Sequence, residues 1–154
     1  MHKNPYAAAL GDRDPLQALA ETPERIRQLV QSWPADKLER SYAPGKWSAR
    51  QVLIHLAQTE MALPTRARFA LSQPGYAAQA FNQDDWMPID AGLDARTALD
   101  AYLAMRKMNV VMFRAADRDR AFTHPEYGPL TVGWVAAQMA GHDLHHLKQL
   151  EQIR

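Results

Sequence analysis

The chain has 154 residues and a formal net charge of +1, and it contains no cysteine. The lack of cysteine excludes disulfides, zinc–thiolate sites and cysteine nucleophiles, and a near-neutral charge without a basic run gives no electrostatic footprint for nucleic acid. With 47% hydrophobic and 23% charged residues, the composition is that of an ordered globular protein. We predict a single domain over residues 1–154.

No apolar run approaches the roughly 20 residues that a helix needs to cross a bilayer. The first residues, Met1–Pro5, lack the apolar core of a signal peptide. We therefore expect a cytoplasmic protein with neither a membrane nor a nucleic acid as its partner.

Residues 1–13 are expected to be a loose N-terminal lead-in. Asp14-Pro15 and Thr22-Pro23 each place an N-cap residue before a proline at the first helical position. They predict a short turn of helix, then a main helix from about Thr22 to Ser32. Residues 34–47 form a connector.

Ser48 begins the clearest helix, because Ser48 and Gln51 fit the capping-box pattern. Pro64 is expected to kink or interrupt this helix, which resumes over Arg66–Leu71. Residues 72–92 contain prolines and glycines and predict a long loop of a kind that is often functional.

Asp94 caps a third predicted helix that runs to about Ala115, residues 117–129 form another loop, and Thr131 caps a last helix. Four amphipathic helices without a convincing strand predict an all-α protein, most simply a four-helix bundle. The long connections 34–47 and 72–92 could cross over the bundle, so a simple up-down topology is not assured.

Three of the six histidines lie on the apolar stripes of predicted helices. His142 and His146 are four residues apart, which places both imidazoles on one helix face, one turn apart. His55 lies on the apolar stripe of its own helix. One metal ion would satisfy all three imidazoles, although each could instead be a hydrogen-bonded core residue. His145 points about 100° away from His146.

Two segments of the chain resemble the signatures of one family. Residues 46–60, KWSARQVLIHLAQTE, are similar to the "KWS…HLA..E" signature of the DinB/YfiT-like superfamily, and residues 141–150, GHDLHHLKQL, to its "HDxHHLxQ" signature. The loop that begins at His124, and its distance from the last helix, also resemble the pattern of this superfamily. The resemblance covers the chain from about Asp14 to Ile153.

The resemblance implies a four-helix bundle of DinB/YfiT type with a metal site at His55, His142 and His146, the same residues that share the apolar faces. The metal in the family is usually zinc or nickel. Characterised relatives are transferases or isomerases that use low-molecular-weight thiols such as bacillithiol, mycothiol or glutathione, and many are homodimers.

Three protein ligands leave a coordination position open, which is typical of catalytic sites. The leading hypothesis is a metal-dependent transferase that activates an exogenous low-molecular-weight thiol for attack on a small-molecule electrophile. The alternatives are a metal-dependent hydrolase that uses bound hydroxide and a non-catalytic metal-containing stress or binding protein. Candidate general bases for the hydrolase are Glu60, Asp84 and Asp85.

The candidate substrate-binding residues lie in the loops. Trp86 and Asp85 belong to the long loop and could cover the metal, and His124 could line the mouth of the site. Trp86 could equally anchor its loop to the core. Arginines on the predicted helices could bind an acidic thiol or substrate, although isolated arginines are more often surface charges; they are Arg50, Arg66, Arg68 and Arg106.

Overall fold

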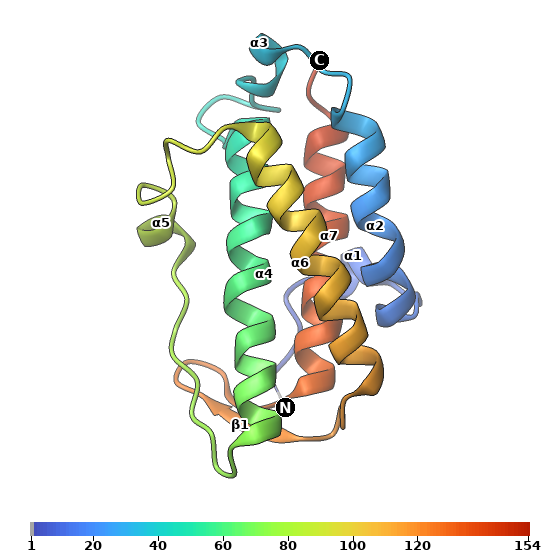
Figure 1. Cartoon of the computed structure of the whole chain (residues 1–154), viewed down its shortest axis with the longest axis vertical. Helices are drawn as coiled ribbons and strands as arrows, with labels where there is room; N and C mark the ends of the chain where they lie inside the picture. The colour runs from blue at the N-terminus through green and yellow to red at the C-terminus, as the bar shows by residue number, and fades with distance from the viewer. Residues whose placement is uncertain (1) are drawn as a thin grey trace.

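The computed structural model describes residues 2–154, and four long helices form its bundle (Figure 1). The long helices are α2 (Pro15–Val30), α4 (Ala49–Ser72), α6 (Ala95–Ala115) and α7 (Val132–Glu151). The connections hold three short helices and two strands: α1 (Ala7–Leu10), α3 (Ala35–Leu38), α5 (Gln83–Trp86), β1 (Ala121–His124) and β2 (Gly128–Thr131). The predicted four-helix bundle is confirmed. No helix among residues 2–154 combines the length and apolar character that a membrane span requires.

The bundle does not follow simple up-down order. Helices α2 and α7 run in one direction, whereas α4 and α6 run in the other (Figure 1). Both α2 and α4 pack along α6 and α7, so α2 and α4 lie on a diagonal although they follow one another in sequence. The connection between α4 and α6 runs the length of the bundle (Figure 1). The two inward faces of α4 and α7 are thereby brought together.

Side-chain caps fix where the long helices begin. Asp14 accepts a hydrogen bond from the backbone N–H of Gln17, Ser48 and Gln51 form the reciprocal capping box, and Asp94 and Thr131 cap α6 and α7. The predicted break at Thr22 is wrong, because α2 continues through Pro23 without interruption.

The predicted interruption at Pro64 is also wrong, because α4 continues through it, and both internal prolines have the same explanation. A helical proline leaves the carbonyl four residues earlier without its N–H partner. Leu19, four before Pro23, gives its carbonyl to the Arg106 guanidinium at 3.1 Å. Glu60, four before Pro64, gives its carbonyl to Asn109 Nδ2 at 3.2 Å. Polar side chains of α6 therefore satisfy both freed carbonyls.

A short antiparallel hairpin, β1–β2, joins α6 to α7, where no strand was expected. His124 pairs with Gly128, whose φ of 68° suits the turn. The long loop adds to this hairpin, since the Ala78 N–H donates to the Thr123 carbonyl at 2.8 Å. Four-residue strands are too short to give a clear alternating pattern in sequence.

The N-terminal segment is not the loose lead-in that the sequence predicts. It contains α1 and packs on α7, and the Tyr6 ring meets the His142 ring edge-on at 5.1 Å between centroids. A Cβ atom at Gly141 would lie 2.5 Å from the Tyr6 carbonyl oxygen, so a glycine permits this close approach. The segment therefore covers the histidine-bearing face of α7.

Candidate metal centre

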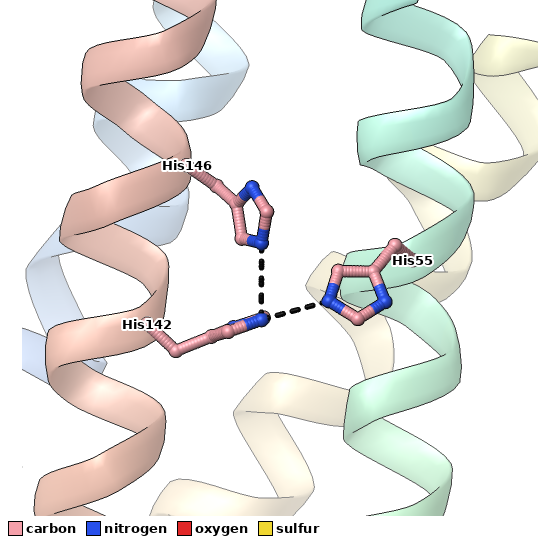
Figure 2. A group of neighbouring side chains, drawn as sticks. All are labelled: His55, His142 and His146. Atoms are coloured by element: carbon pink, nitrogen blue, oxygen red, sulfur yellow. Dashed lines mark hydrogen bonds between the residues drawn. The ribbon is translucent and has the colours of Figure 1, made fainter. Parts of the chain in front are cut away.

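Three histidines from two helices converge between α4 and α7 (Figure 2). His55 comes from α4, and His142 and His146 come from α7. The Nε2 atom of His142 lies 2.8 Å from Nε2 of His55 and 3.0 Å from Nε2 of His146. All three side chains are buried, and together they form a cluster whose ligand atoms lie within 4.8 Å of one another. The structure thus brings together the three residues that the sequence selected.

The far side of the His146 ring makes a hydrogen bond that fixes its orientation, and the far side of the His142 ring faces a carboxylate. The Nδ1–H of His146 donates to Gln149 Oε1 at 2.7 Å, so His146 Nε2 carries a lone pair. His142 Nδ1 faces Asp143 Oδ1 at 3.7 Å, and neither atom has another partner among the described residues. A proton on His142 Nδ1 would face this carboxylate, and His142 Nε2 would then also carry a lone pair.

Burial keeps the imidazoles of His55 and His146 neutral. It lowers the pKa of His55 to about 2, and the neighbouring His142 lowers it further, against a smaller opposing effect of Asp143. Burial, with His142 and His55 beside it, also holds the pKa of His146 well below its usual range. A neutral imidazole is the form that binds metals.

A chain of buried charges lies directly behind His142. Asp143 Oδ2 accepts from Arg106 Nη1 at 2.6 Å and from the Tyr102 hydroxyl at 2.8 Å. Arg106 also pairs with Glu60, its Nε donating to Oε1 at 2.9 Å, and Asn109 donates to the other Glu60 oxygen. Burial raises the pKa of Glu60, whereas Arg106, acting against burial, holds the pKa of Asp143 below its usual value. The carboxylate that faces His142 is therefore the one that stays ionised.

Two cavities border the cluster. One of about 260 Å³ is lined by His55 and His142, and one of about 270 Å³ is lined by His146. Tyr6 of the N-terminal segment and Gln83 of the long loop border both cavities. Each of the three histidines therefore lines a cavity.

The three predicted substrate-binding residues lie in different places. His124 lies in β1, where it is buried and lines the cavity beside His55. Trp86 stands behind Phe81, with 4.8 Å between ring centroids, and Phe81 is the loop residue that faces His55. Asp85 is exposed and does not line either cavity.

Trp86 also anchors its loop, since Gln58 Nε2 donates to the Trp86 carbonyl at 3.0 Å and to Asp90 at 2.7 Å. The sequence offered Glu60 as a candidate general base and Arg106 as an isolated arginine of the kind that is more often a surface charge, and both are buried. Their separation of 46 residues hid the pairing.

Comparisons with known proteins agree with this fold. The chain is 25% identical over 142 residues to "Putative metal-dependent hydrolase OB0782" of Oceanobacillus iheyensis, covering 90% of this chain and 83% of that protein. A second protein of the same name and organism, OB0413, is 26% identical over 131 residues, covering 82% of this chain and 76% of that protein.

A solved structure shows the same architecture. YfiT from Bacillus subtilis, described as having "an unusual four-helix bundle topology", superposes with a TM-score of 0.82 at 23% identity, covering 90% of this chain and 83% of that one. The sequence pattern of the DinB superfamily matches residues 18–150. These findings confirm the resemblance drawn from the two signature segments, and the chain belongs to the DinB superfamily.

Proposed function

We propose that His55, His142 and His146 hold one divalent transition metal ion and that the centre activates a low-molecular-weight thiol for transfer to an electrophile. The observation that supports a metal ion is that the lone pairs of two imidazole nitrogens point toward each other. His142 Nε2 and His146 Nε2 lie 3.0 Å apart, and both carry lone pairs in the tautomers that Asp143 and Gln149 favour. Two acceptors at this distance repel each other unless a cation lies between them.

The donor set fits such an ion. Imidazole nitrogens at about 2.0–2.1 Å from a tetrahedral metal lie roughly 3.3 Å from one another, close to the spacings of 2.8 and 3.0 Å seen here. Zinc and nickel are the metals we expect from the family resemblance, and three imidazoles suit both.

A divalent ion at this position lowers the pKa of a thiol or a water molecule and so supplies a nucleophile at neutral pH. The chain's own residues provide the rest. His55, His142 and His146 leave space open toward both cavities, and Phe81 and Tyr6 restrict access of water from the loop and the N-terminal segment. In the proposed transfer, a bond forms between the thiol sulfur and the electrophile as the leaving group departs, and the S–H proton goes to solvent.

Hydrolysis is the second candidate, and the names of the relatives favour it. A hydrolase needs a base near the nucleophile. Glu60 is held by Arg106 and Asn109, and Asp85 lies outside both cavities. Asp84 lines the cavity beside His146 and is the acidic candidate that remains of the three.

The first experiment is elemental mass spectrometry on untagged protein. We expect about one equivalent of a transition metal in the parent protein and none in the His142→Ala/His146→Ala double variant. The control variant His145→Ala, which changes the exposed neighbouring histidine, should retain the metal. Parent protein without metal when purified and after incubation with zinc or nickel would overturn the proposed centre.

Turnover assays then separate the reaction classes. Transfer of a cellular thiol to a model electrophile, with loss of activity in His55→Ala, would support the transferase. Ester or amide cleavage without added thiol would support the hydrolase, and a metal-loaded protein without either activity would support a non-catalytic binding protein.

We also propose a homodimer, which is expected from the family resemblance. An exposed apolar stripe on α6, at the spacing of one helix face, supports it; its members are Ala104, Met108, Val111 and Ala115. Light scattering should give twice the chain mass for the parent and for Lys107→Glu, and the single-chain mass for Met108→Glu/Val111→Glu.

A further inference from the structure

The cavity beside His55 and His142 continues away from the histidines toward the β1–β2 hairpin. Thr59 follows His55 by four residues and Gln138 precedes His142 by four. Because α4 and α7 run in opposite directions (Figure 1), both residues lie one helical turn toward the same end of the bundle. Together they line this part of the cavity.

Two buried polar atoms in this cavity have no hydrogen-bond partner within residues 2–154. They are Thr59 Oγ1 and Gln138 Oε1, and the Thr59 side chain is almost fully buried, at 2% exposed. Buried polar groups are normally hydrogen-bonded because an unsatisfied one is costly. Their joint placement in one cavity is suited to binding a polar ligand group.

His124 and Arg66 supply hydrogen-bond donors at the wall of the same cavity. His124 Nδ1 accepts the backbone N–H of Glu126 at 3.2 Å, which leaves the proton of the neutral ring on Nε2. Arg66 Nη2 donates to the Gln79 carbonyl at 2.7 Å, which holds the side chain in place. The exposed Glu126 lies at the rim of the cavity, where its negative charge opposes the positive charge of Arg66.

We propose that this cavity is a carboxylate subsite, in which Arg66, His124 and Thr59 bind the acid group of the thiol that the metal centre activates. The inference rests on the proposed function for the identity of that ligand. Arg66 lies eleven residues beyond His55, a rise of about 16 Å. Its side chain points back toward the start of α4 and spans roughly 6 Å of this distance. The acid group therefore lies several bonds away from the reacting sulfur.

Calorimetric titration of the metal-loaded protein tests the subsite with matched probes. Two probes are carboxylate thiols, 3-mercaptopropionate and 6-mercaptohexanoate, and each is compared with its neutral amide. A third pair, pentanoate and pentanamide, lacks sulfur. Because a charge-assisted hydrogen bond is about twice as strong as a neutral one, we expect at least one carboxylate thiol to bind about tenfold more tightly than its amide. Arg66→Gln should reduce this preference to about twofold.

Two control variants sharpen the result. Arg68→Gln makes the same change of charge two residues along α4, outside the cavity lining, and should keep the preference. Glu126→Gln removes the opposing charge and should tighten carboxylate binding about threefold, because a nearby like charge disfavours an anion.

The outcomes separate the subsite from the proposed function. Equal affinity for acids and amides, or a preference that survives Arg66→Gln, overturns the subsite while thiol binding stands. If the carboxylate thiols bind no more tightly than pentanoate, and the binding of all three depends on Arg66, the thiol function falls and the subsite stands. If none of the six probes binds, both fall.

Discussion

Two buried polar groups lie side by side in this bundle, and they differ in how completely their polar atoms are hydrogen-bonded. In the Glu60–Arg106–Asp143 group, the guanidinium pairs with both carboxylates, and Tyr102 and Asn109 donate to their oxygens. In the three-histidine cluster, Nε2 atoms face one another at 2.8 and 3.0 Å, and the Nδ1 atoms of His55 and His142 have no partner among the described residues.

The difference separates structure from function. Three of the four carboxylate oxygens in the ion-paired group accept hydrogen bonds, whereas the histidine cluster brings ring nitrogens together, an arrangement that suits a bound cation. Asp143 connects the two groups, since one of its oxygens accepts from Arg106 and the other faces His142. The paired group thus holds the Asp143 carboxylate against His142.

The largest effect is expected from breaking the paired group. Arg106→Met leaves two buried carboxylates and the Leu19 carbonyl without their partner, and losing one member of a buried ion pair costs about 3–5 kcal/mol. Urea unfolding of the metal-free protein measures this loss of stability. Arg27→Met, which removes an exposed pair with Glu24, is the control and should leave the unfolding midpoint unchanged. A similar small change in both variants would refute the structural role of Arg106.

Acid should destabilise the metal-free protein through the histidine cluster. Burial depresses the pKa values of His55 and His146 in the folded state, whereas an unfolded histidine titrates near 6.5. The unfolded chain therefore binds protons that the folded chain refuses, so stability is complete above about pH 6.5 and falls as the pH drops toward the folded pKa values. The slope should be about 1.4 kcal/mol per pH unit for each histidine.

Urea unfolding at several pH values between 6.5 and 5 measures this slope. The His55→Gln variant should reduce this slope by the contribution of one histidine, about 1.4 kcal/mol per pH unit. A parent protein whose stability does not change over this window would show that the folded cluster accepts protons as readily as the unfolded chain.

A single added methyl group at Gly141 should loosen the packing of the N-terminal segment on α7. Gly141→Ala places a Cβ against the Tyr6 carbonyl and Cβ, and overpacking of this kind costs about 1–3 kcal/mol. Tyr6 should move off His142, which would raise the rate of proteolysis before Asp14. Gly92→Ala, where no atom lies within 4 Å of the added Cβ, should leave both stability and proteolysis unchanged. Equal proteolysis of the two variants would show that Tyr6 is not held by this contact.

The histidine site was predictable because its signals are local. The four-residue spacing of His142 and His146, and the apolar stripe around His55, show in the sequence which faces turn inward. The capping box at Ser48 likewise fixes the start of α4 within four residues.

The surroundings of the site were not predictable, because their contacts join distant segments. Arg106 meets Glu60 across 46 residues and Asp143 across 37, and nothing in the sequence shows that these charges pair. Pro23 and Pro64 suggest helix breaks until the donors on α6 are known. The packing of Tyr6 on α7 depends on Gly141, which lies far from it in the sequence.

The smallest expected effect is the most specific to the metal centre. Gln149 accepts the Nδ1–H of His146 and is itself only half-buried. Removing such a partner of a metal-binding histidine typically lowers metal affinity by 10- to 100-fold. Gln149→Leu should therefore weaken zinc binding by about tenfold in a competition titration with a chelator, with little change in the stability of the metal-free protein. Gln149→Glu keeps an acceptor at Nδ1 and should keep or strengthen binding. If leucine and glutamate at position 149 weakened zinc equally, Gln149 would act by packing and not by orienting His146.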